Sequence, residues 1–94
     1  VGPRHPDTDK IPEGIEAQPH ATFSNVIAIL EAANLDMSNV VDIMVFLTDM
    51  KNDFKKFNSI YSEYLEGYEA TRTTVEVGAL PTPISVEFKV VAKK

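Results

Sequence analysis

The end of the chain holds an arginine and a glutamate whose side chains could bind an anion and move a proton. Arg72 lies in the run Thr71–Val77 and Glu87 in the run Ser85–Ala92, and a loop rich in glycine and proline joins the two runs. Both runs are rich in β-branched residues, which predicts two strands. An arginine presents a planar fork of donors to a carboxylate, and a glutamate can deprotonate a water molecule.

Alternation along these strands predicts where the two side chains point. Phe88 and Val90 should face the core, which places Glu87 on the opposite face of the sheet. The same reasoning applied to Val75 places Arg72 on that face too. We therefore expect Arg72 and Glu87 to project together from the non-core side of one small sheet. An ordinary solvated pair is the alternative interpretation of the same pattern.

Two helices and one further strand are expected ahead of these strands. An apolar stripe predicts a helix from near Gln18 to about Ala33. The apolar run Val40–Leu47 predicts a central strand that is buried on both faces. A second apolar stripe predicts a helix that Asn52 or Asp53 caps and that ends before Gly67. A strand end is also expected at Val1–Gly2.

These elements predict a two-layer α+β domain with both helices on one face of the sheet. The strand at Val40–Leu47 and the strand at Thr71–Val77 should run parallel, because a helix joins them. At 94 residues the chain makes one small domain. Its modest core, and a second sheet face that mixes apolar and charged residues, predict an oligomer packed through that face.

Composition excludes several classes of function. The chain has no cysteine, so disulfides, a thiol nucleophile and cysteine-ligated metal sites are excluded. The net charge of −5 disfavours a nucleic-acid surface, because such surfaces need clustered positive charge. No apolar run reaches the length of a membrane span.

Three segments resemble the reactive-intermediate imine deaminase family, also known as the YjgF or L-PSP endoribonuclease type. They are Ile11–Gln18, then Asn52-Asp53-Phe54 with Asn58 and Tyr61, and last Thr71–Val77 with Leu80-Pro81 and Val86-Glu87. The resemblance covers nearly the whole chain. Family members have two or three strands before the point that corresponds to Val1, so we expect the domain at residues 1–94 to be incomplete at its N-terminus.

The resemblance implies a chorismate-mutase-like fold and a trimer. The absence of cysteine fits a reducing cytosol, so we expect a cytoplasmic location. It implies hydrolysis of reactive 2-imino or enamino acids of the 2-aminoacrylate type to 2-oxo acids and ammonia, without a metal or other cofactor. Arg72 and Glu87 would be the catalytic residues. Arg72, Thr74 and Asn58 would bind the substrate.

Other functions remain open at this point. Many imine deaminases have cysteine at the position of Thr74, and the segment Thr71–Thr74 is similar to that of 2-aminomuconate deaminases. A non-catalytic trimeric module that binds a small carboxylate or a protein is the alternative from another class. An endoribonuclease is disfavoured by the acidic composition.

Overall fold

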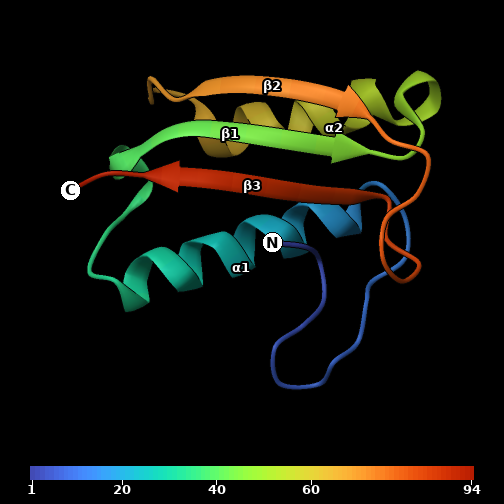
Figure 1. The fold of residues 1–94 in the computed structure, drawn as a ribbon, viewed down its shortest axis with the longest axis horizontal. Helices are drawn as coiled ribbons and strands as arrows, with labels where there is room; N and C mark the ends of the chain where they lie inside the picture. The colour runs from blue at the N-terminus through green and yellow to red at the C-terminus, as the bar shows by residue number, and fades with distance from the viewer.

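Three strands and two long helices form the protein in a computed structural model that describes residues 1–94 (Figure 1). This arrangement confirms the predicted α+β class. Neither helix is long and apolar enough to cross a membrane. The elements in chain order are α1 (Ala17–Ala32), a 3₁₀ turn (Met37–Asn39), β1 (Val40–Leu47), α2 (Met50–Leu65), β2 (Thr71–Glu76) and β3 (Val86–Ala92).

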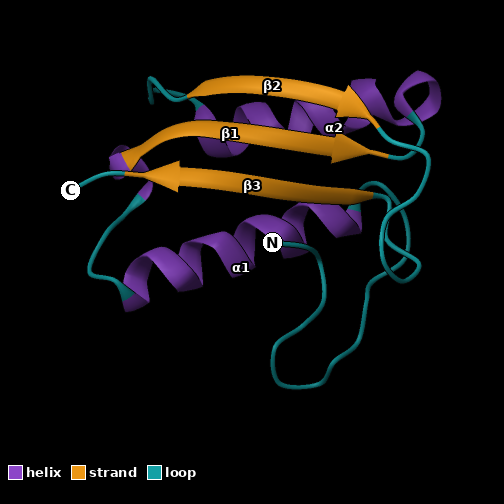
Figure 2. Ribbon diagram, in the orientation of Figure 1, coloured by secondary structure: helices purple, strands orange, loops and turns teal.

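The sheet has the strand order β2-β1-β3, with β1 in the centre as predicted (Figure 2). β1 runs parallel to β2 and antiparallel to β3. The parallel pair follows from the helix that joins β1 to β2, because such a connection returns the chain to the same end of the sheet.

The core lies between the sheet and the helices. The side chains of Ile43, Val45 and Leu47 point from β1 toward the helices and are fully buried. Phe23 of α1 and Phe57 of α2 are also fully buried, and both rings meet Phe88 of β3 edge to face, at centroid distances of 4.8 Å and 6.0 Å.

The prediction that β1 is buried on both faces is wrong for this chain. Met44 and Phe46 on the other face are only half-buried, and Val41 is 46% exposed. Helices cover one face of the sheet, so side chains on the second face have no layer above them. An apolar sequence pattern alone does not distinguish a strand covered by helices on both sides from one whose second face meets another copy.

α2 begins earlier than the sequence predicted. Its N-cap is Asp49, whose carboxylate accepts a hydrogen bond from the Asn52 N–H, and not Asn52 or Asp53. The Met50 N–H donates to Glu76 Oε1 of β2 at 2.9 Å. These two carboxylates satisfy N–H groups of the first turn, so the helix starts at Met50. Gly67 follows the helix with φ +86°, a left-handed conformation that glycine adopts readily and that commonly ends a helix.

Gln18, at the start of α1, fixes the beginning of β3. Its side chain is 3% exposed, and its Oε1 accepts a hydrogen bond from the Ser85 N–H at 2.7 Å. Its Nε2 donates to the Pro12 carbonyl at 3.1 Å. One buried amide therefore joins the loop before α1 to the residue that precedes β3.

No strand is assigned at Val1–Gly2, although Val1 makes two backbone hydrogen bonds to β3. The Val1 amino group donates to the Phe88 carbonyl at 2.8 Å, and the Phe88 N–H donates to the Val1 carbonyl at 2.8 Å. The first residue of the chain therefore pairs with the outer edge of β3.

Candidate functional site

Strand register places Arg72 on the helix side of the sheet. Arg72 is paired with Ile43 of β1, whose side chain is fully buried under the helices. Glu87 is paired with Phe46, which points the other way. Residues paired directly across two strands share a face. The expectation that Arg72 lies on the non-core side is therefore wrong, and the same expectation for Glu87 is confirmed.

The position of β2 at the sheet edge explains this difference. Polar residues of β2 face the flank of α2, where Glu76 meets the first turn of that helix. Val75 is paired with Phe46, so this apolar residue faces the open side. The predicted alternation was correct, but the apolar residues of this edge strand do not mark the helix side.

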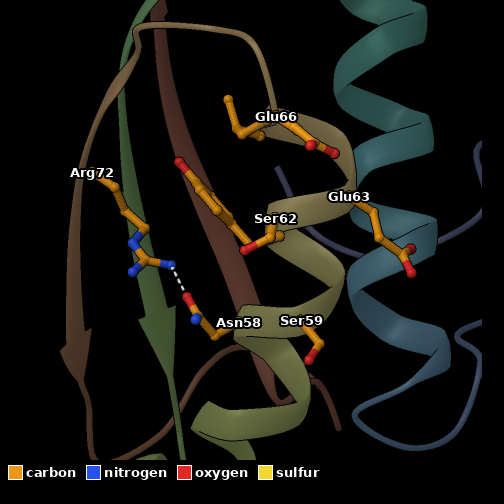
Figure 3. A pocket seen from close by; sticks show the side chains of 8 residues that line it. Asn58, Ser59, Ser62, Glu63, Glu66 and Arg72 are labelled. Carbon is orange, nitrogen blue, oxygen red and sulfur yellow. Dashed lines mark hydrogen bonds between the residues drawn. The ribbon is translucent and has the colours of Figure 1, made fainter.

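Arg72 reaches from β2 toward α2 (Figure 3). Its Nη1 donates to Asn58 Oδ1 at 2.6 Å. Its guanidinium carbon lies 4.6 Å from the ring centroid of Tyr61 and 5.7 Å from that of Phe54. The two rings attract the cation through their negative faces, and Asn58 fixes its orientation. Arg72 and Asn58, two of the residues expected to bind the substrate, are therefore in contact.

Arg72 is an exposed cation without an acidic partner. The two ion pairs of the protein join Arg4 to Asp9 and Lys56 to Glu16. A guanidinium has five N–H donors, and Asn58 uses one of them here. The remaining donors are available to a planar, two-oxygen acceptor such as a carboxylate.

Two hollows flank Arg72, with volumes of about 710 Å³ and about 610 Å³. The first opens along α2, and Figure 3 shows the polar side chains that line it. It is lined by Asn58, Ser59, Tyr61, Ser62, Glu63, Leu65, Glu66 and Arg72. The second is lined by Met50, Lys51, Phe54, Lys55, Arg72 and Thr74. Arg72 belongs to both, so a small ligand in either hollow would meet it.

Tyr61 and Thr74 bring two unsatisfied hydroxyls to this region. Neither hydroxyl has a hydrogen-bond partner in the protein, although both are buried. Burial raises the pKa of Tyr61, with the nearby Arg72 opposing the rise and Asp42 adding to it. Sequence reasoning treated Tyr61 only as a core residue. Its spacing of three from Asn58, which places both on one side of α2, is the signal that points to this second role.

Glu87 lies apart from Arg72. It is half-buried on the open face, and its carboxylate lies close to Gly2. A Cβ atom built onto Gly2 would be 3.9 Å from Glu87 Oε1. One intervening strand and a register difference of three residues separate it from Arg72. Strand spacing and rise put the two Cα atoms roughly 14 Å apart. The two predicted catalytic side chains therefore do not converge within one copy of the chain.

Comparison with known proteins identifies the family. A family model described as Endoribonuclease L-PSP matches residues 2–94. The chain belongs to this family. A RutC family protein of Aquifex aeolicus is 40% identical over 92 residues, which covers 96% of this chain and 73% of that protein.

Other L-PSP family members agree in sequence and fold. TdcF of Escherichia coli, named as a candidate reactive intermediate deaminase, is 33% identical over 90 residues, covering 93% of this chain and 69% of TdcF. A crystal structure of E. coli TdcF with bound serine superimposes with a TM-score of 0.90 at 32% identity, covering 99% of this chain and 75% of that one. A candidate endoribonuclease of Thermotoga maritima gives a TM-score of 0.93 at 33% identity, covering 99% and 73% of the two chains. The predicted resemblance is thereby confirmed.

Proposed function

We propose that the protein is a deaminase that hydrolyses reactive 2-imino or enamino acids of the 2-aminoacrylate type to 2-oxo acids and ammonia. The observation that carries this proposal is the unpaired Arg72 guanidinium, held by Asn58 over the ring of Tyr61 beside a hollow. A carboxylate fits the free donors of that guanidinium. The name of TdcF supports the reaction class, and the serine in a TdcF structure supports a small amino-acid-like ligand.

In this reaction Arg72 binds the substrate carboxylate and Glu87 transfers protons as the general base and acid. Glu87 removes a proton from water as the water oxygen bonds to the imine carbon, and the electron pair of the C=N bond moves to nitrogen. The protonated Glu87 then returns that proton to the nitrogen, which gives a carbinolamine. Glu87 next takes the hydroxyl proton as the carbon–oxygen double bond forms and passes it to the departing nitrogen, so that ammonia leaves and the carboxylate is regenerated. No redox step occurs and no metal is required.

Because Arg72 and Glu87 lie on opposite faces of the sheet, the reaction needs both residues from different copies of the chain. We propose a homotrimer packed through the open faces of the sheets, with Arg72 of one copy and Glu87 of its neighbour at each site. The half-buried apolar side chains of Met44, Phe46 and Val75 on the open face support this packing. Sedimentation as a monomer at micromolar concentration would contradict it.

Freshly generated 2-aminoacrylate provides the test of function. Pyruvate and ammonia should appear in equal amounts and faster than in the protein-free reaction. A chelator should leave the rate unchanged, because the proposed chemistry uses no metal. Acceleration should be lost in the Arg72→Ala protein. A 2-aminomuconate substrate in the same assay distinguishes the two deaminase classes, and an RNA substrate tests the endoribonuclease alternative.

The second candidate is a non-catalytic module that binds a small carboxylate, and the TdcF structure with bound serine favours it. Serine binding measured by calorimetry, without any pyruvate release from 2-aminoacrylate, would assign this function instead. The expected cytoplasmic location also stays a prediction, which cell fractionation tests.

A further inference from the structure

The second hollow beside Arg72, of about 610 Å³, has only cations among its charged side chains. They are Lys51, Lys55 and Arg72, and no aspartate or glutamate lines the hollow. Neither lysine belongs to the ion pairs of the protein, which use Arg4 and Lys56 as their cations. In a chain whose net charge is −5, this hollow, called the lysine hollow below, therefore gathers positive charge that no carboxylate of the protein pairs with.

Helix α2 carries both lysines where a helix favours anions. Lys51 is the second residue of α2 and Lys55 lies about one turn later. Residues four apart project from the same side of a helix, and like charges at this spacing repel each other. Cations in the first turns also oppose the helix macrodipole, whose positive end lies there. The carboxylate of the N-cap Asp49 hydrogen-bonds to Asn52 and to neither lysine. A bound anion would relieve both of these unfavourable effects.

Thr74 adds a hydrogen-bond donor to the lysine hollow. Thr74 is paired with Val45, whose side chain is fully buried on the helix side, so Thr74 and Arg72 share that face of β2. The Thr74 hydroxyl is buried and has no hydrogen-bond partner in the protein. Because buried polar groups are normally paired, an oxygen atom of a ligand in the hollow would satisfy this hydroxyl. Phe54, whose ring centroid is 5.7 Å from the guanidinium carbon, adds an apolar wall.

The first hollow beside Arg72 has the opposite charge. Apart from Arg72, its charged lining residues are Glu63 and Glu66. Figure 3 shows the Glu63 side chain directed away from Arg72. A ligand whose carboxylate binds Arg72 would meet carboxylates in the first hollow and ammonium groups in the lysine hollow. A second carboxylate on the same ligand is therefore favoured only in the lysine hollow.

We propose that Lys51 and Lys55 determine the substrate specificity of this site and select 2-imino acids that carry a second carboxylate on the side chain. This inference rests on the proposed deaminase function and extends it. Arg72 binds the carboxylate beside the imine carbon, and the two lysines bind the second carboxylate through charge-assisted hydrogen bonds. Hydrolysis of such a substrate consumes one water molecule and gives a 2-oxo dicarboxylic acid and ammonia.

Ligand binding tests the proposal without turnover. Calorimetry at fixed ionic strength compares glutarate with pentanoate, which has the same number of carbons but one carboxylate. Glutarate should bind roughly tenfold tighter or more, because the second carboxylate adds hydrogen bonds to charged groups. The double variant Lys51→Gln/Lys55→Gln should lose this preference. Lys56→Gln is the matched control, because Lys56 pairs with Glu16 and should leave the preference unchanged.

Two binding results would overturn the proposal. One is equal affinity for glutarate and pentanoate, which includes the case in which neither binds. The other is a preference for glutarate that persists in the double variant. A fold defect does not explain a lost preference if the double variant melts no lower than the original protein. We expect such a melting temperature, because the two substitutions remove a like-charge pair.

Turnover gives the second test. The imine of glutamate, produced in the assay by an amino-acid oxidase with O₂, should be hydrolysed with a kcat/KM roughly tenfold or more above that of 2-aminoacrylate. The double variant should lose this advantage. Faster hydrolysis of the imine of lysine would assign specificity to the glutamates of the first hollow and would overturn the proposal. Tight glutarate binding without hydrolysis of any imine would instead contradict the deaminase function and leave the role of the lysines intact.

Discussion

Arg72 and Glu87 lie on opposite faces of the sheet, separated by the central strand β1. Arg72 is paired with Ile43 on the helix side, and Glu87 is paired with Phe46 on the open side. The backbone separation of roughly 14 Å is longer than a small 2-imino acid. Under the proposed mechanism, a substrate that touches both side chains would bridge two copies of the chain.

Mixed assembly of two inactive variants tests this shared site. We expect Arg72→Ala and Glu87→Gln to be inactive separately and to regain activity when refolded together in equal amounts. In the proposed trimer each site would take Arg72 from one copy and Glu87 from the next, so random mixing should restore about a quarter of the sites. Pyruvate release from 2-aminoacrylate gives the active fraction. A mixture that stays inactive would place both residues in one copy.

Arg72→Lys tests the carboxylate clamp. Lysine keeps the positive charge but loses the planar fork, so kcat/KM should fall by roughly 10–100-fold, mainly through a higher KM. Arg4→Lys is the matched control, because Arg4 pairs with Asp9 in the N-terminal loop, away from the site. Steady-state kinetics of both variants should separate them. Unchanged kcat/KM in Arg72→Lys would exclude the clamp.

Glu87→Gln tests the proton transfer. Glutamine keeps the size and hydrogen-bonding capacity of glutamate but cannot accept the proton, so kcat should fall by roughly 10²–10⁴-fold while substrate binding persists. A solvated surface glutamate would instead change neither rate nor melting temperature. Glu69→Gln, at an exposed position, serves as the control. Equal kcat for the original protein and Glu87→Gln would favour the binding module.

Tyr61→Phe should not destabilise the protein, although Tyr61 is only 7% exposed. Its hydroxyl is buried without a partner, so its removal should increase the free energy of unfolding by about 1 kcal/mol. Tyr68→Phe, at a position that is 46% exposed, should change it little. Urea unfolding measures both. A clear loss of stability in Tyr61→Phe would mean that the hydroxyl has a partner in solution.

The same substitution should alter the alkaline limit of stability. Burial raises the pKa of Tyr61, so above the ordinary tyrosine pKa of 10.0 the unfolded chain releases the Tyr61 proton before the folded protein does. The contribution of Tyr61 to the free energy of unfolding is fully present below pH 10.0 and is lost as the pH rises through the pKa of the folded protein. The melting temperature should fall less steeply with rising pH for Tyr61→Phe than for the original protein.

Gln18→Leu should destabilise the fold by about 1–3 kcal/mol, because it leaves the Ser85 N–H without its acceptor. Ser24→Ala, at an exposed position of α1, should stay within about 0.5 kcal/mol of the original protein. Urea titrations give both values. A Gln18→Leu protein as stable as the original would show that another group can satisfy the Ser85 N–H.

Local patterns predicted the elements well. The apolar period of α1, the run Val40–Leu47 and the β-branched segments of β2 and β3 gave bounds within one or two residues of the structure. These signals are local, because helix and strand periods act over a few neighbouring residues. The start of α2 was predicted less well, since Glu76, 26 residues farther along the chain, supplies an acceptor for the Met50 N–H.

The sequence by itself determined that Arg72 and Val75 lie on opposite faces of β2, and that Glu87 and Phe88 lie on opposite faces of β3. Successive side chains of a strand point to opposite faces. Which face meets the helices was decided only by tertiary structure. Pairing with Ile43 turned Arg72 toward Asn58 and Tyr61, and pairing with Phe46 turned Glu87 away from them. Strand register depends on contacts between residues far apart in sequence, and for an edge strand with few apolar residues the local pattern does not specify it.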